Sequence, residues 1–248
     1  MTPRLTIATA ARVLRQLRRD RRTIALLLML PLLLLTLLWW MFIDTTGPSG
    51  EPIFDPLGAR LMGLFPMLLM FVITSVTTLR ERTSGTMERL MASPTGKADV
   101  VLGYALAFGI VASVQALVLV GFTVGVLDLD IQGATWALAL IIVLDGLLGT
   151  ALGLAASSLA TTEFQAVQMM PAVILPQLLL SGLFLARNQM PRVLEVFSDV
   201  LPLSYAIDAI NHLLVGDTGE IWPQVAVLTG FIVGALALGV ATLRRRTP

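Results

Sequence analysis

The feature that most constrains this sequence is a series of long apolar runs without charged residues. A helix crosses the roughly 30 Å hydrocarbon core of a bilayer in about 20 residues. Five uncharged runs are near or above that length, and a sixth is interrupted only by Asp145; the six cover residues 23–43, 61–79, 100–127, 131–162, 164–186 and 221–243. The sequence therefore predicts an all-α integral membrane protein with six transmembrane helices.

The composition leaves little room for a separate soluble unit. Of the 248 residues, 56% are hydrophobic and 13% are charged, whereas soluble domains carry about 25% charged residues. No polar stretch is long enough to form a domain of ordinary size. We therefore expect residues 1–248 to form a single membrane domain, with no enzyme module attached.

The chemistry of the chain is restricted by residue types that it lacks. It has no cysteine and a single histidine, His212. Disulfides and thiolate metal sites are excluded, and a histidine-based metal site or a Ser-His-Asp arrangement is hard to build. The phosphate-binding pattern Gly-x-x-x-x-Gly-Lys-Ser/Thr is also absent from the sequence. We expect no catalytic residue, metal site or cofactor in this chain.

The distribution of charge predicts the orientation in the membrane. With both termini inside, the inner segments hold fourteen of the seventeen basic residues, and ten of the sixteen acidic residues lie outside. Cytoplasmic segments are enriched in Lys and Arg, so this orientation, with an even number of spans, is favoured. The first run is too long for a signal-peptide core and no Ala-x-Ala site follows it, so we expect an uncleaved first span. The arginine-rich composition suggests a bacterial cytoplasmic membrane.

Three segments lie between or before the apolar runs. Residues 4–20 place Ile7, Ala11, Leu14 and Leu17 near one helical face among arginines, which predicts an amphipathic helix on the inner membrane surface. Residues 80–99 form a charged inner loop. Residues 187–220 form a half-apolar outer loop, in which Pro202 separates two short helices that we expect to dip into the outer leaflet.

The inner loop has two interpretations from its residues alone. Thr86 can cap a short helix that Pro94 ends. The segment can be a solvated hairpin that obeys the positive-inside rule, or a rigid helix that docks a cytoplasmic partner.

Two segments resemble the ABC-2-type transporter permeases, the membrane subunits of bacterial drug- and antibiotic-efflux-like systems. The first is Glu81-Arg-x-x-Gly85-Thr86-x-Glu88-x-Leu90-x-x-Ser93-Pro94 in the inner loop. The second comprises Leu-Ser-Gly-Leu-Phe at 180–184, Met-Pro at 190–191 and Leu-Pro-Leu-Ser-Tyr-Ala-Ile-Asp-Ala at 201–209. The resemblance covers nearly the whole chain and implies the same six-span arrangement, with an amphipathic start and two half-helices before the last span.

The resemblance also implies partners and functional residues. ATP and Mg²⁺ would bind to separate cytoplasmic ATPase subunits, and a second permease chain, identical or related, would complete the unit; no nucleic acid is implied. The residues expected to couple the chain to the ATPases are Arg80, Glu81, Gly85, Thr86, Glu88 and Arg89. Spans two and five would line a central path, for which the candidates are Phe65, Phe71, Met170, Ile174 and Gln177.

Polar and helix-breaking residues inside the spans have alternative interpretations. Asp145 is either a structural hydrogen-bonding group or a contact for substrate or protons, because a charged Asp at mid-membrane costs on the order of 3 kcal/mol. The glycines at 146, 149 and 153 allow close helix approach and favour the structural role. Pro171 and Pro176 interrupt span five, either as a packing kink or as a mobile wall of the path.

These observations predict the permease subunit of an ATP-driven exporter. The short outer loops and apolar path suggest a hydrophobic drug- or antibiotic-like cargo. The alternatives are an exporter of a lipid or cell-wall glycolipid, and a membrane scaffold or immunity protein that does not transport.

Overall fold

The computed structural model describes residues 3–47, 50, 52–86 and 96–242. Helices account for nearly all of this part of the chain. They are α1 (Pro3–Arg19), α2 (Arg21–Phe42), α3 (Phe54–Thr83), α5 (Lys97–Gly125), α6 (Thr135–Leu159), α7 (Glu163–Leu180), α8 (Arg192–Val200), α9 (Pro202–Leu214) and α10 (Trp222–Thr242), with short 3-10 turns at Arg187–Gln189 and Thr218–Ile221.

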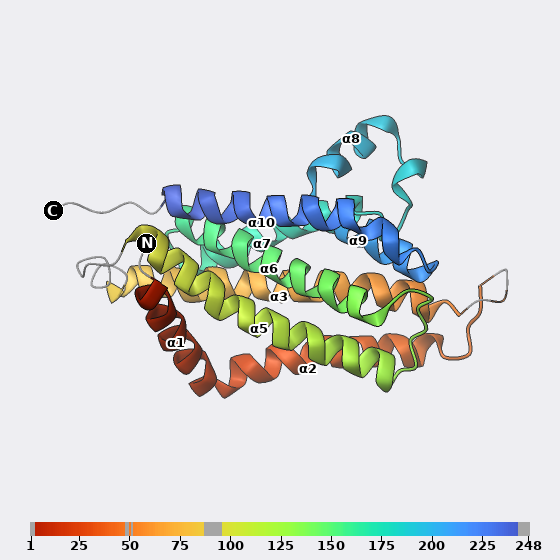
Figure 1. Cartoon of the computed structure of the whole chain (residues 1–248), viewed down its shortest axis with the longest axis horizontal. Helices are drawn as coiled ribbons and strands as arrows, with labels where there is room; N and C mark the ends of the chain where they lie inside the picture. The colour runs from red at the N-terminus through yellow and green to blue at the C-terminus, as the bar shows by residue number, and fades with distance from the viewer. Residues whose placement is uncertain (1–2, 48–49, 51, 87–95, 243–248) are drawn as a thin grey trace.

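The long helices form an elongated bundle (Figure 1). Helices α2, α3, α5, α6, α7 and α10 run along its length and alternate in direction. One end, here called the loop end, is where α3 finishes and α5 starts on either side of residues 84–96. The start of α1 and the end of α10 lie at this same end. The opposite end carries α8 and α9 and is called the α8–α9 end.

Within the described residues, five helical segments are long and apolar enough to cross a membrane, which supports a membrane protein of several spans. They are Arg21–Phe42, Phe54–Thr83, Lys97–Gly125, Thr135–Leu159 and Thr218–Thr242. Helix α7 is not among them, because its 18 residues include Glu163 and three glutamines. The predicted run 164–186 also ends early, at Leu180, since Gly182 adopts a φ of +90° that turns the chain.

Helix α6 lies at the centre of the bundle. It packs against α3, α5, α7, α9 and α10, and its face toward α3 is made of glycines. A Cβ atom on Gly149 would lie 2.2 Å from the carbonyl oxygen of Met67, and one on Gly153 would lie 2.7 Å from that of Phe71. The backbones of α3 and α6 therefore meet directly, as small residues allow between membrane helices.

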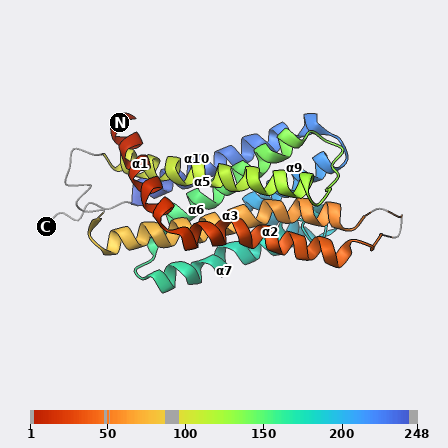
Figure 2. The same ribbon diagram turned by 90° about the horizontal axis from the view of Figure 1, so that it is seen from below.

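Helix α1 runs obliquely across the loop end rather than along the bundle (Figure 2). Thr9, Ala10 and Val13 are buried on its inner side, whereas Ile7 is 61% exposed. The apolar face expected from the sequence therefore packs on the protein only in part, because Leu14 and Leu17 are half-buried against the same core as Val13, whereas Ile7 and Ala11 are exposed. Asp20 separates α1 from α2, and its carboxylate accepts hydrogen bonds from the backbone N–H and the hydroxyl of Thr23 at 3.2 and 2.6 Å, which caps α2.

The two short helices expected in residues 187–220 are present and meet at Pro202. Helix α9 is held deep in the bundle, where the Leu213 carbonyl accepts a hydrogen bond from the Gly133 N–H at 2.8 Å. Helix α8 extends away from the bundle and buries only Ser198. All four tryptophans lie toward this end, at the finish of α2 and the starts of α6 and α10.

Candidate functional site

A buried polar cluster joins three helices at the loop end. Arg12 of α1 donates from Nη2 to Glu81 Oε2 of α3 at 2.8 Å and to the Tyr104 hydroxyl of α5 at 2.9 Å. Tyr104 in turn donates to the same Glu81 oxygen. The Arg12 guanidinium also lies over the Tyr104 ring, 5.8 Å from its centroid. These three residues, called the Glu81 cluster, fix α1 against the end of α3.

The electrostatics of the cluster depend on burial and on charge pairing. Glu81 is only 4% exposed, so its carboxylate depends on Arg12 and Tyr104 for compensation. Burial alone would lower the pKa of Arg12, but the hydrogen bond to Glu81 and the charges of Tyr104 and Glu81 outweigh it and raise that pKa. Arg12 therefore remains charged and Glu81 remains paired.

A second set of contacts fixes α1 along α5. The Thr6 hydroxyl lies 3.4 Å from Asp99 Oδ1, and the other oxygen of Asp99 accepts the Gly96 N–H at 3.1 Å. Gly103 has no room for a side chain, because a Cβ atom there would lie 2.6 Å from the Thr9 Cβ. A movement of the chain at Gly96 would therefore reach α1 through two groups of contacts.

The coupling residues predicted from the sequence separate into exposed, buried and undescribed positions. Arg80 is exposed and forms a bidentate ion pair with Glu163 at the start of α7, in which both contacts measure 2.9 Å. Gly85 adopts a φ of +72°, and the Thr86 hydroxyl lies 3.0 Å from that of Ser84. Glu81 is inside the Glu81 cluster. Glu88 and Arg89 lie outside the described residues.

The residues predicted for the substrate path lie on α3 and α7, which pack side by side. Phe65 and Met170 are half-buried, whereas Phe71, Ile174 and Gln177 are at most 2% exposed. Both polar atoms of the Gln177 side chain are hydrogen-bonded within the protein. Its Oε1 accepts the Leu203 N–H at 3.2 Å, and its Nε2 donates to the Val173 carbonyl at 3.2 Å. Within this single chain, Gln177 thus joins α7 to the start of α9.

Asp145 lies in the middle of α6 and is completely buried. Neither of its carboxylate oxygens has a hydrogen-bond partner among the described residues. The position that a Cβ atom on Gly63 would occupy is 3.4 Å from Oδ2, so the carboxylate faces α3 across its glycine. The structural hydrogen bond anticipated for this residue is not present within the described part of the chain.

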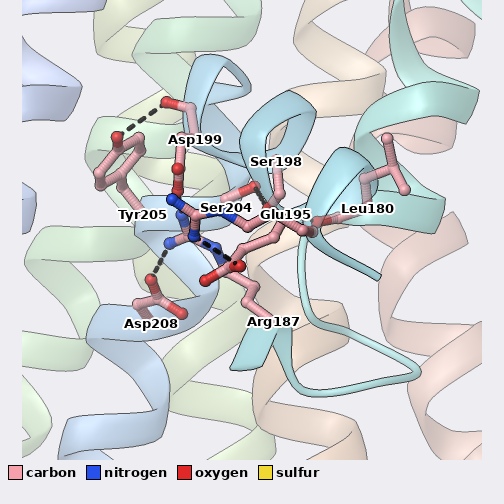
Figure 3. A network of polar contacts seen from close by, with 9 residues as sticks. Leu180, Arg187, Glu195, Ser198, Asp199, Ser204, Tyr205 and Asp208 are labelled. Atoms are coloured by element: carbon pink, nitrogen blue, oxygen red, sulfur yellow. Dashed lines mark hydrogen bonds and ion pairs between the residues drawn. The ribbon is translucent and has the colours of Figure 1, made fainter. Parts of the chain in front are cut away.

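A polar network that the sequence did not reveal holds the α8–α9 end together (Figure 3). Arg187 lies between Asp199 of α8 and Asp208 of α9 and pairs with both. The Tyr205 hydroxyl donates to the Asp199 carbonyl at 2.8 Å, and the Ser198 hydroxyl donates to the Leu180 carbonyl at 2.7 Å. Helices α7, α8 and α9 are thereby connected through one group of side chains.

Burial and pairing act in opposite directions in this network. Burial raises the pKa of Asp208, and the attraction of Arg187 offsets the rise only in part. For Arg187, burial would lower the pKa, but Asp208 and then Asp199 outweigh it and raise the pKa. The arginine is thus the fixed charge of the network. No spacing between residues 187, 199 and 208 could have indicated that they meet.

Comparison with known proteins gives a family match over most of the chain. The profile of the ABC-2 type transporter family matches residues 4–215. Similar proteins include the ABC transporter G family member 20 of Dictyostelium discoideum, with 24% identity over 81% of this chain and 28% of the relative. The probable multidrug ABC transporter permease YbhR of Escherichia coli shares 25% identity over 67% of this chain and 47% of the relative.

Two further relatives are named as an inner membrane transport permease and a nodulation protein. The inner membrane transport permease YhhJ of Escherichia coli shares 28% identity over 72% of this chain and 48% of its own length. Nodulation protein J of Rhizobium meliloti shares 29% identity over 68% of this chain and 65% of its own. The matched part of this chain corresponds to less than half the length of YbhR and YhhJ.

Proposed function

Since the chain belongs to the ABC-2 type transporter family, we propose that it is the permease subunit of an ATP-driven exporter. The cargo proposed is a hydrophobic drug- or antibiotic-like molecule that leaves the cell. The names of relatives support this choice, because YbhR is described as a probable multidrug permease and YhhJ as a transport permease. This chain would be the membrane subunit of the exporter, and ATP and Mg²⁺ would bind to a separate cytoplasmic ATPase.

We propose six spans, with α7 as the fifth crossing. Helix α7 runs from the loop end to the α8–α9 end in the same sense as α2 and α5, and its outward face is apolar, with Phe164 71% and Leu179 61% exposed. Pairing of α7 with a second permease chain, identical or related, would cover this face. Its three glutamines would then lie in protein or along the path rather than in lipid.

The loop end is proposed to face the cytoplasm of a bacterial cell. It carries most of the basic residues, which are enriched at the inner membrane face, whereas most acidic residues lie at the α8–α9 end. In this orientation both described ends of the chain are inside. Helix α1 would lie on the inner surface, with Ile7 and its neighbours turned to lipid, and α8 would rest its exposed apolar face in the outer leaflet.

The junction of α1, α3 and α5 is the observation that carries the proposed coupling mechanism. ATPase subunits would press on Arg80, Gly85, Thr86 and the adjoining undescribed residues, including Glu88 and Arg89. Glu81 would act as a positioning residue, because it transmits a displacement of α3 to Arg12 and hence to α1. The movement would continue along α3 to its seam with α7, where Phe65, Phe71, Met170, Ile174 and Gln177 lie.

The test is co-purification with a soluble ATPase, sought first among the products of neighbouring genes, followed by ATP hydrolysis in lipid nanodiscs with and without hydrophobic drugs. A stable complex whose turnover rises with drug would support the exporter and begin to identify cargo. A complex that hydrolyses ATP but responds only to lipid or glycolipid would favour the second candidate cargo. Absence of any ATPase partner would refute the transporter proposal and favour a scaffold or immunity role.

A further inference from the structure

A small pocket opens at the elbow where α1 turns into α2. Its volume is about 210 Å³. The lining is mixed. Its apolar members come from α1, α3 and α5 and are Val13, Leu17, Val72, Ile73, Val76 and Phe108, and its polar members are Gln16, Asp20, Thr23, Thr77 and Arg80. The pocket is separate from the Glu81 cluster and from the seam of α3 with α7.

The elbow beside this pocket is strongly basic. The arginines at 15, 18, 19, 21 and 22 are all exposed, and none of them forms an ion pair within the described residues. The single acid of the elbow, Asp20, is already engaged by Thr23, whose hydroxyl and N–H lower the pKa of that carboxyl. The elbow therefore presents uncompensated positive charge next to a pocket with an apolar side.

We propose that this elbow binds an anionic phospholipid of the inner leaflet. An acyl chain would lie against Val76 and its neighbours, and the phosphate would be held by the arginines of the α1–α2 turn. The inference rests on the inward orientation of the loop end given under the proposed function. It assigns a regulatory or anchoring lipid to a position that the substrate path does not use and that shares Arg80 with the coupling residues.

Size and charge favour a lipid over the other candidate occupants. The pocket is smaller than the roughly 300–1,000 Å³ typical of sites for drug-sized molecules, but part of one acyl chain can enter it. A free phosphate would use the arginines and leave the apolar walls unfilled. Only an amphiphile with a negative head uses both parts, and each basic residue near an anionic membrane surface adds on the order of fivefold in affinity.

The test measures lipid retention by native mass spectrometry of the full chain purified in detergent. The probes are phosphatidylglycerol and phosphatidylcholine with identical acyl chains. Two variants remove the two parts of the site separately. Val76→Trp fills the pocket without changing the charge. A quadruple variant removes the contacts to the lipid head group by changing Arg18, Arg19, Arg21 and Arg22 to Gln. Val76→Phe is a milder pocket variant in case the Trp variant does not fold. Leu117→Trp, on the exposed surface of α5, and Arg192→Gln are the matched controls.

We expect the unchanged chain and both controls to retain phosphatidylglycerol at least tenfold more strongly than phosphatidylcholine. Each of the two test variants should lose that preference. Equal retention of both lipids, or a pocket variant that keeps the preference while the arginine variant loses it, would overturn the proposal, since binding would then be general surface attraction. Arginine variants that keep the lipid but lose the ATPase would also overturn it. A chain that retains the lipid but has no ATPase partner would refute only the exporter.

Discussion

Glu81 and Asp145 are both carboxylates buried inside the bundle, and their surroundings differ. Glu81 shares one oxygen between Arg12 and Tyr104, whereas neither oxygen of Asp145 has a partner among the described residues. A buried charge without compensation is costly, and removing one member of a buried pair leaves such a charge behind. The two residues therefore give opposite expectations for substitution.

Removing the cation of the Glu81 cluster should destabilise the fold. We expect Arg12→Met to cost about 3–5 kcal/mol, because Glu81 would remain buried and unpaired. For a chain of this size the Tm should fall by about 6–20 °C, measured by thermal unfolding in detergent.

The double variant Arg12→Met with Glu81→Met provides the control for that loss. Replacing both members of a buried pair with apolar groups of similar size is often close to neutral, so the Tm should return to within a few degrees of the unchanged chain. If the double variant were less stable than Arg12→Met alone, the two side chains would not be acting as a pair.

Asp145→Asn should leave the Tm unchanged or raise it. The substitution keeps the size of the side chain and removes the ionisable group, whose charged form costs on the order of 3 kcal/mol at mid-membrane. The same thermal unfolding assay measures the effect. A clear fall in Tm would mean that the carboxylate has a partner outside this chain, and a loss of drug-stimulated ATP hydrolysis at unchanged Tm would assign Asp145 to the transport path.

At the scale of helices, the closest approach in the molecule is between α3 and α6. Gly149→Ala would place a methyl group 2.2 Å from the Met67 carbonyl oxygen, and neither backbone can move without separating the two helices. We expect a loss of about 3 kcal/mol or more, at the upper end of the usual cost of overpacking, measured as the fall in Tm.

Gly121→Ala on α5 is the matched control, because no atom lies within 4 Å of its Cβ position. There the substitution should be neutral or slightly stabilising, since Ala favours a helix over Gly. Equal effects at the two positions would mean that α3 and α6 are not in direct backbone contact.

Helix α8 depends on Arg187 for its position against α9. Arg187→Gln removes both ion pairs and leaves Asp199 and Asp208 close together, so the backbone amides of α8 should exchange hydrogen at least tenfold faster while those of α9 remain protected. Mass spectrometry of the exchanged peptides measures this. Arg192→Gln is the control, because the Arg192–Glu195 pair is exposed and such pairs contribute little. Unchanged exchange in α8 would show that the Ser198 and Tyr205 contacts hold it without Arg187.

The apolar runs predicted the long helices well because hydropathy follows the same bilayer thickness that sets helix length. The ends were less predictable. Helix α3 starts at Phe54, seven residues before the run at Leu61, and so includes Arg60, which donates from Nε to Asn211 Oδ1 of α9 at 2.8 Å. Helix α7 stops at Leu180, where Gly182 turns the chain. Both ends depend on contacts or backbone turns that an apolar run does not record.

The candidate site was less accessible to sequence reasoning than the fold. The motif around Glu81 indicated a functional loop, but the partners of Glu81 are 69 and 23 residues away along the chain. The acidic partners of Arg187 are also far from it in sequence, 12 and 21 residues away. Long-range pairs between single polar residues leave no periodic signal, so only the three-dimensional arrangement shows that Glu81 is buried and paired rather than exposed.

At the scale of the whole molecule, the proposed six-span topology depends on α7 crossing the membrane. The chain has no cysteine, so single cysteines report the side of each segment without background labelling. Thr161→Cys lies before α7, and Gly216→Cys lies after α9. Six spans place residue 161 inside and residue 216 outside, whereas a chain in which α7 stays on one side places both positions together.

Labelling of intact cells with a membrane-impermeant maleimide should therefore modify Gly216→Cys and spare Thr161→Cys, and permeabilised cells should modify both. Gly50→Cys, between α2 and α3, serves as the outer reference, because its side does not depend on α7. Labelling of both test positions in intact cells, or of neither, would contradict the crossing by α7. The basic loop end and the direction in which α7 runs both favour the first outcome.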